Sequence, residues 1–127
     1  MCYDGRVPSI HICATGEPFL HTDILMFIDY AIKVYGKTSI QTNFYAKIFE
    51  NNDYIKELIK RGKNIRYITT DVLSGDPQEH EMLKKGSKYH EVLDAMEILS
   101  KKSNIFFHVH LILTKYNYQN IDKLIIE

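Results

Sequence analysis

The stretch IHICATGEPFLHTDILMFIDYAIK, residues 10–33, decides the fold because it contains the pattern of a strand, a tight turn and a helix in succession. The run PSIHICA (8–14) is apolar and β-branched, and it stops at TGEP (15–18). Apolar residues then recur at helical spacing until Gly36, a residue type that commonly ends a helix. The stretch therefore predicts one β-strand followed by one amphipathic helix.

The same alternation of strand and helix continues along the chain, and the third crossover holds two helical pieces. Further strands are predicted at 37–42, 64–70 and 104–114, and further helices at 52–62, 76–86, 88–102 and 118–127. Strands separated by helices of this length form parallel βαβ units, and strands that are apolar on both faces fit a sheet covered by helices. The sequence therefore predicts an α/β protein with about four βα units.

Two architectures accommodate such a sheet, a partial (β/α) barrel of parallel strands and a small doubly wound sheet. A full eightfold barrel takes roughly 250 residues, so 127 residues supply only a part of one. We expect residues 1–127 to form a single partial domain. The apolar final segment LIIE (124–127) indicates a portion of something larger.

Composition and charge argue against several classes of protein. The chain has 16 basic and 16 acidic residues, so its formal net charge of zero offers no electrostatic basis for binding nucleic acid or an anionic membrane. No apolar run approaches the ~20 residues that span a bilayer, and the first residues contain no apolar signal core. We expect a cytoplasmic protein whose cysteines, Cys2 and Cys13, stay reduced, with Cys13 a small core residue of the first strand.

Polar residues follow every predicted strand. In both architectures the carboxyl ends of the strands form the ligand site. The segments at these ends are Thr15-Gly16-Glu17-Pro18, Thr42-Asn43, Thr70-Asp71 and Thr114-Lys115-Tyr116-Asn117. Such residues are also common in turns and helix caps, which leaves a purely structural role open. Gly16-Glu17 is more specific, because a glycine lets a ligand approach the backbone and a carboxylate can hold a ligand ammonium group.

The order and spacing of these segments resemble the radical S-adenosylmethionine (radical SAM) enzyme superfamily. Residues 10–33 are similar to the family's second strand and following helix, where an apolar strand leads to Gly-Gly-Glu-Pro and then to a histidine before the helix. SIQTN (39–43) resembles the third strand, which ends in Thr-Asn-Gly. Residues 67–99 resemble the fourth strand and its crossover. The resemblance extends over about residues 7–127 and implies a partial radical SAM barrel.

The resemblance also implies a binding site for SAM. In the family, the loop after the second strand holds the methionyl amino group of SAM, and the third strand ends at the same pocket. The end of the fourth strand lies near the ribose or the carboxylate. The residues that the resemblance assigns to cofactor binding are Thr15, Gly16, Glu17, Thr42, Asn43, Thr70, Asp71 and Asn117. The catalytic residues and the substrate stay unknown.

The chain departs from the family pattern at the pocket and at the cluster. Thr15, Phe44 and Val72 stand where the family has glycine, and Lys85 stands where an arginine precedes Gly86. Because bulky residues adopt positive φ poorly, these changes predict an altered pocket geometry. The family holds a [4Fe–4S] cluster with a CxxxCxxC motif, whereas these 127 residues contain only two cysteines.

The leading hypothesis is a portion of a radical SAM core that binds SAM. The resemblance implies that a full-length or completed protein would cleave SAM reductively at its [4Fe–4S] cluster and generate a 5′-deoxyadenosyl radical. A cluster needs thiolate ligands. We therefore expect this chain alone to be inactive in that reaction, and whether it is an enzyme stays open.

Two alternatives also fit these residues. A cluster-free remnant could bind SAM or a nucleotide without catalysis, or it could pair along the exposed edge of strand 8–14 with a partner chain or N-terminal segment that supplies cysteines. His108 and His110 share one face of a strand and could serve a metal-dependent hydrolase. For His21 and His80, beside predicted helix starts, we expect structural roles rather than catalytic ones.

Overall fold

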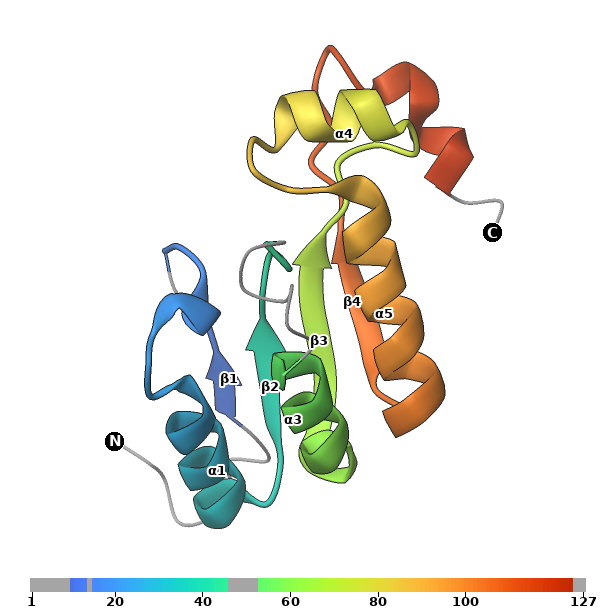
Figure 1. Ribbon diagram of the computed structural model, residues 1–127. Coiled ribbons are helices and arrows are strands. Elements are labelled where there is room, and N and C mark those ends of the chain that lie inside the picture. Colours follow the sequence, from blue (N-terminus) through green and yellow to red (C-terminus); the bar gives the residue numbers. More distant parts are fainter. Residues whose placement is uncertain (1–9, 14, 46–52, 125–127) are drawn as a thin grey trace.

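The computed structural model describes residues 10–13, 15–45 and 53–124, which form one four-stranded parallel sheet with its helices (Figure 1). The strands are β1 (Ile10–Ile12), β2 (Thr38–Gln41), β3 (Ile65–Asp71) and β4 (Phe106–His110). The α-helices are α1 (Ile24–Tyr35), α3 (Asp53–Arg61), α4 (Pro77–Leu83) and α5 (Tyr89–Ser103). Three short 3₁₀ helices are η1 (Pro18–Leu20), η2 (Gly62–Asn64) and η3 (Tyr118–Leu124). No helix among these residues is long and apolar enough to cross a membrane.

The arrangement of strands and helices decides between the two architectures. The strands lie in chain order, β1-β2-β3-β4, and all neighbouring pairs are parallel. Figure 1 shows α1, α3 and α5 in front of the same face of the sheet, with α4 and η3 above the carboxyl ends of the strands. A doubly wound sheet reverses its strand order and carries helices on both faces, whereas a barrel adds strands in sequence with the helices outside. The chain is therefore an α/β fold with four strands of a partial barrel.

The hydrophobic core lies between the sheet and these helices. Ile28 of α1, Leu58 of α3 and Leu99 of α5 are fully buried. They belong to one cluster with Ile40 of β2 and Ile68 of β3. Burying a side chain of this size contributes about 1.5–3 kcal/mol relative to leaving it exposed. This layer therefore holds the carboxyl ends of the strands in fixed positions.

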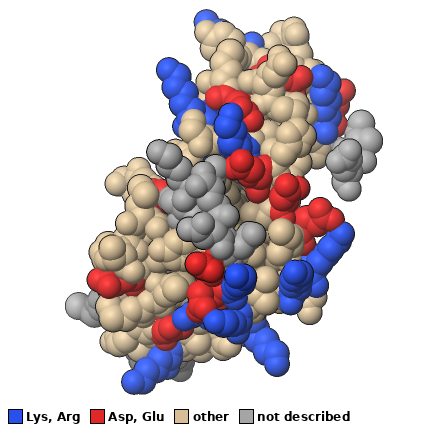
Figure 2. Space-filling model, viewed as in Figure 1, with Lys and Arg blue, Asp and Glu red and all other residues tan. Residues whose placement is uncertain are grey.

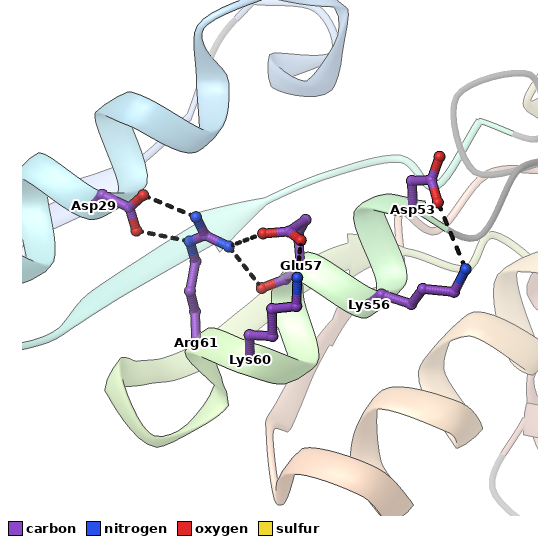
Figure 3. Close-up of polar contacts among 6 residues, drawn as sticks. All are labelled: Asp29, Asp53, Lys56, Glu57, Lys60 and Arg61. Carbon is purple, nitrogen blue, oxygen red and sulfur yellow. Dashed lines mark hydrogen bonds and ion pairs between the residues drawn. The ribbon is translucent and has the colours of Figure 1, made fainter.

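An arginine clamp ties α3 to α1 (Figure 3). Arg61 donates from Nε and Nη2 to the two carboxylate oxygens of Asp29, at 2.7 and 2.8 Å, and from Nη1 to Glu57 at 2.5 Å. The hydrogen bond from Arg61 lowers the pKa of Asp29, and the bond to Asp29 raises the pKa of Arg61. Such a two-pronged pair fixes geometry better than a single contact does. It therefore joins α3 to α1 at one point on their surfaces.

Two helix ends are capped as the sequence predicts, whereas α4 ends earlier than predicted. Gly36 ends α1 with a φ of 76°, a conformation that glycine adopts without strain. The Asp76 side chain accepts the Glu79 N–H at the start of α4. The prediction that this helix runs to Gly86 is wrong, because it stops at Leu83 and the next residue has left the helical conformation.

The last strand and the last helix are shorter or more irregular than predicted. β4 ends at His110 rather than at residue 114, because its partner β3 ends at Asp71 and offers no further ladder. The final segment forms the 3₁₀ helix η3, with a non-helical residue at Asn120, instead of a regular helix. The polar loop before η3 has its own hydrogen bonds, which the strand pattern of the sequence did not reveal.

The prediction of strands buried on both faces is wrong for the edges of the described sheet. Phe106 and Val109 of β4 are 73% and 46% exposed, and Ile10 of β1 is also exposed. Cys13, predicted as a core residue, is exposed; it follows β1 directly, and Ile10 and His11 of that strand are exposed as well. Cys2 lies outside the described residues.

Candidate cofactor-binding site

The side chain of Glu17 fastens the loop after β1 to the end of β2. Its Oε1 accepts hydrogen bonds from the Phe19 N–H at 3.1 Å and from Thr42 Oγ1 at 2.8 Å. Its Oε2 accepts the Asn43 N–H at 2.6 Å. Glu17 is only 5% exposed. The carboxylate is therefore a cap for η1 and a brace between two loops, and it fixes the backbone that faces solvent around it.

Thr15 and Gly16 precede this brace and are exposed. A Cβ added at Gly16 would meet no atom of the described residues within 4 Å, and the residue does not have a positive φ. The fold of the chain itself therefore does not require glycine here. The backbone at this position is open to an approaching molecule, which is what glycine at a strand end permits.

The loop after β2 keeps the left-handed backbone that the family's glycine implies, although Phe44 occupies the position. Its φ is 49°, which costs roughly 1–2 kcal/mol for a residue other than glycine. The Phe44 ring is 1% exposed and lies 6.1 Å from the Phe107 ring, so its burial offsets the strain. The Phe44 N–H also donates to Thr42 Oγ1 at 3.1 Å. Val72, in the loop after β3, has no positive φ, so that loop does not form the glycine turn of the family pattern.

A buried cation lies at the end of β3. Lys84 extends from the end of α4, and its Nζ donates to the backbone oxygen of Asp71 at 2.9 Å and lies 3.9 Å from Asp71 Oδ2. Lys84 is 9% exposed. Burial lowers the pKa of Lys84, and the negative charges of Asp71 and Glu17 partly offset this effect. The positive charge of Lys84 therefore interacts both with Asp71 at the end of β3 and with Glu17 in the loop after β1.

Sequence reasoning missed Lys84 and assigned the family's arginine position to its exposed neighbour, Lys85. The spacing within α4 could have found it. Lys84 lies four residues after His80, so the two share one side of the helix, and His80 is fully buried. The helix stops at Leu83, three residues before the predicted end, and the Lys84 side chain turns toward β3.

The two histidines expected to be structural are structural. The Leu73 N–H donates to His80 Nδ1 at 3.1 Å, so Nε2 carries the hydrogen and donates to Ser87 Oγ at 3.0 Å. These bonds hold α4 against the loop after β3. His21 Nδ1 accepts the Asp23 N–H at 3.1 Å at the start of α1.

The buried imidazole of His80 should make stability depend on pH. Burial, and secondarily the charge of Lys84, lowers the pKa of His80 below its ordinary value. The contribution of neutral His80 to the free energy of unfolding is complete above the pKa of about 6.5 that a histidine has in the unfolded chain. It is lost as the pH falls through the lower pKa of His80 in the folded chain. Between about pH 7.5 and pH 5 we expect urea unfolding to show a loss of at most about 2 kcal/mol.

The comparison with His80→Gln identifies the source of this pH dependence. His80→Gln should be less stable at both pH values and should show a flatter dependence between them. The control is His90→Gln, which changes an exposed histidine on α5 and should keep the wild-type dependence. Equal slopes for the wild type and His80→Gln would contradict the assignment.

Asn117 is buried at 1% exposure and joins the loops after β3 and β4. Its Oδ1 accepts from the N–H and the hydroxyl of Thr114 at 2.7 and 3.0 Å. Its Nδ2 donates to the backbone oxygens of Leu73 at 2.5 Å and Ile112 at 2.8 Å. Because an amide side chain has two donors and two principal acceptor sites, all are in use. Asn117 therefore holds the shape of this part of the edge.

Thr70 lies apart from the other predicted residues. It is fully buried, and the pairing of Thr70 with Val109 and of Ile68 with Phe107 places it on the same face as Ile68, toward the helices. Its hydroxyl has no hydrogen-bond partner in the described part of the chain. The adjacent Asp71 lies on the other face of β3.

The histidines of β4 contact residues of the neighbouring strand β3. The His108 ring stacks on Tyr67, with the ring centres 4.0 Å apart. His110 Nδ1 lies 3.7 Å from Asp71 Oδ1. Within the described ranges, no three His, Cys, Asp or Glu residues come together in a way that could hold a metal ion. The hydrolase alternative therefore has no supporting geometry.

The structure thus brings six of the eight predicted residues into two neighbouring groups at the carboxyl edge of the sheet, and Thr70 and Asn117 belong to neither group. One group is the braced pair of loops, with Thr15, Gly16, Glu17, Thr42 and Asn43. The other is Asp71 with Lys84, whose charge also interacts with Glu17.

Comparison with known proteins agrees with the fold. Residues 4–126 match the family model of the Radical SAM superfamily. A comparison with curated proteins gives no match. The family match covers nearly the whole sequence, and the parallel sheet with its helices on one face is consistent with part of that family's barrel. The chain belongs to the radical SAM superfamily.

Proposed function

We propose that residues 1–127 form a partial radical SAM core domain that binds SAM at the carboxyl edge of its sheet. The observation that carries the proposal is the loop containing Gly16 and Glu17. Three hydrogen bonds to Glu17 hold the loop rigidly, while the space beside Gly16 is open and serves no purpose in the packing of the described chain. A fixed loop with an accessible backbone is suited to bind a polar ligand.

Each predicted residue has a distinct part in this proposal. Thr15 and Gly16 would present backbone oxygens to the methionyl ammonium group, and Glu17 would position them from behind. Thr42 and Asn43 would form the adjacent wall. Asp71 would accept hydrogen bonds from the ribose, and Lys84 would balance its charge.

Two of the eight residues would act indirectly, through the shape of the pocket. Asn117 has no hydrogen-bonding group left over, so it would hold the loops after β3 and β4 in place. Thr70 lies toward the helices, so it would position Asp71 rather than bind the ligand.

The thiols of this chain do not fit a [4Fe–4S] cluster by themselves. The 127 residues contain two cysteines, and Cys13 is exposed after β1. The clusters of this family need more thiolate ligands than two. In a completed protein the cluster would supply the electron for reductive cleavage of SAM. The residues described above would orient the SAM.

A second candidate is a SAM- or nucleotide-binding module completed by another chain or segment that pairs with the edge of β1. Among the described strands, the edge of β4 is open in the same way. Phe106 and Val109 leave apolar surface exposed on a strand that pairs, in the described part of the chain, with β3 alone. Exposed edges of this kind pair readily with further strands. A folded chain that ignores SAM until such a partner is added would favour this candidate.

SAM binding to the anaerobically purified chain, measured by calorimetry, tests the main proposal. The wild type should bind SAM, and Gly16→Val should bind it at least about tenfold more weakly because the added side chain fills the open space. Urea unfolding should change by no more than about 0.5 kcal/mol, since nothing in the fold is displaced.

The control is Leu20→Ala, which changes a side chain of the same loop that is 69% exposed and should leave SAM binding unchanged. Equal affinity of Gly16→Val and the wild type would overturn the assignment of the loop. A folded wild type that does not bind SAM would overturn the proposal for the isolated chain.

A further inference from the structure

A pocket lies at the edge of the sheet opposite the candidate SAM site, where β2, β3 and β4 begin. It has a volume of about 440 Å³, within the range of small-molecule sites. Its lining includes Lys37 before β2, Lys63 and Arg66 at the start of β3, and Asn104 and Phe106 at the start of β4. In the view of Figure 2, Lys and Arg side chains project at this lower end of the molecule, the end at which the strands begin in Figure 1.

The charge of this pocket is unbalanced. No acidic residue lines it among the residues that the structure describes, and Lys37, Lys63 and Arg66 form no ion pair within the described chain. Three cations around one hollow repel each other, and the hollow concentrates their field. The positive potential in the pocket therefore favours binding of an anion. The cations of α3 differ from those of the pocket, because Lys60 and Arg61 both have a carboxylate partner (Figure 3).

The lining also combines charge with an apolar surface. Arg66 can bind two oxygens of a phosphate at once, and lysines add point charges. Phe106, at 73% exposure, offers a flat face on which a planar ring can stack. We propose that this pocket binds a phosphate-bearing small molecule that also carries a planar ring, the chemistry of a nucleoside phosphate.

A structural role for these cations has to be distinguished from a binding role. α1, α3 and α5 all end at this edge, and cations near helix carboxyl ends are stabilised by the helix dipole. Lys37 and Lys63 each lie two residues beyond such an end, so the dipole accounts for them in part. Arg66 lies within β3, five residues beyond the end of α3 and two beyond the three-residue 3₁₀ helix η2, so the dipole of a regular α-helix does not account for it. The purely structural account expects a loss of stability on substitution and no bound ligand.

Titration of the 127-residue protein with ADP, pyrophosphate and adenosine at low salt tests the proposal. ADP should bind with a Kd between roughly 10 μM and 1 mM, pyrophosphate more weakly, and adenosine not measurably. Arg66→Gln should weaken ADP binding at least about tenfold, equivalent to about 1.4 kcal/mol. Lys102→Gln changes an exposed lysine of α5 outside the pocket and should have no effect.

Two further variants test the stacking role of Phe106 and the independence of this pocket from the SAM site. Phe106→Ser should weaken binding of ADP and leave that of pyrophosphate unchanged. Gly16→Val should bind ADP as the wild type does, so that failure of this pocket and failure of the SAM site give different results. Absence of ADP binding, or equal binding by Arg66→Gln, would overturn the site. Equal affinities for ADP and pyrophosphate would overturn the role of the ring.

Discussion

Glu17→Ala should lower the free energy of unfolding by about 4 kcal/mol, a large part of the roughly 5–15 kcal/mol typical of a single domain. The variant leaves three donors without their acceptor: two backbone N–H groups and the hydroxyl of Thr42. Hydrogen bonds to an ionised group contribute about 1.5–3 kcal/mol each, and a buried donor that loses its partner costs a similar amount. The measurement is urea unfolding of the variant beside the wild type.

Two milder variants show whether the loss follows from the hydrogen bonds. Thr42→Val removes one donor to the same carboxylate and should cost about 1–2 kcal/mol. Glu17→Gln keeps the shape but directs an amide donor at a donor, so its stability should lie between those of Thr42→Val and Glu17→Ala. A loss below about 1 kcal/mol for Glu17→Ala would show that the brace contributes little. Because Glu17→Ala also disturbs the loop, Gly16→Val remains the variant with which SAM binding is tested.

The order of elements could be predicted from the pattern of the sequence, whereas the partial barrel was predicted, correctly, only through the family resemblance. Hydrophobic patterns located the described strands and most of the α-helices, and the Asp76-Pro77 start signal located α4, because these signals are local properties of the chain. The choice between a barrel and a doubly wound sheet depends on which face each helix covers, and this is decided by the handedness and order of all crossovers together. The strand FFHVH (106–110) is apolar enough for a buried strand. Its exposure follows from its place at the edge of the described sheet, which the strand sequence does not encode.

The motif at Gly16 and Glu17 could be located by resemblance, but the bonds that define its geometry could not. The hydrogen bonds from Thr42 and Asn43 to Glu17 join residues 25 and 26 positions apart. The sequence also could not predict toward which face of the sheet the Thr70 side chain points. In the pairing of β2 with β3, two steps from Thr38 to Ile40 correspond to three steps from Ile65 to Ile68. An extra residue of this kind shifts the alternation of side chains, so counting from the start of the strand gives the wrong face.

Asn117→Ala should lower the free energy of unfolding by about 3 kcal/mol, because four hydrogen bonds are lost together at a buried position. The backbone oxygens of Leu73 and Ile112 lose their donor, and Thr114 loses its acceptor. The loops after β3 and β4 would then lack the side chain that joins them. Urea unfolding gives the magnitude, and hydrogen exchange of the Thr114 amide should increase before global unfolding.

The control is Asn120→Ala, which lies in η3 and removes only the long contacts, 3.3 and 3.4 Å, from its Nδ2 to Glu79. That variant should cost no more than about 0.5 kcal/mol. Asn117→Asp keeps the shape and the two acceptors but sets a carboxylate against two backbone oxygens, so it should be at least as unstable as Asn117→Ala. If Asn117→Asp were instead as stable as the wild type, the donors of Asn117 would contribute nothing. The edge would then be held by packing of the loops rather than by their hydrogen bonds.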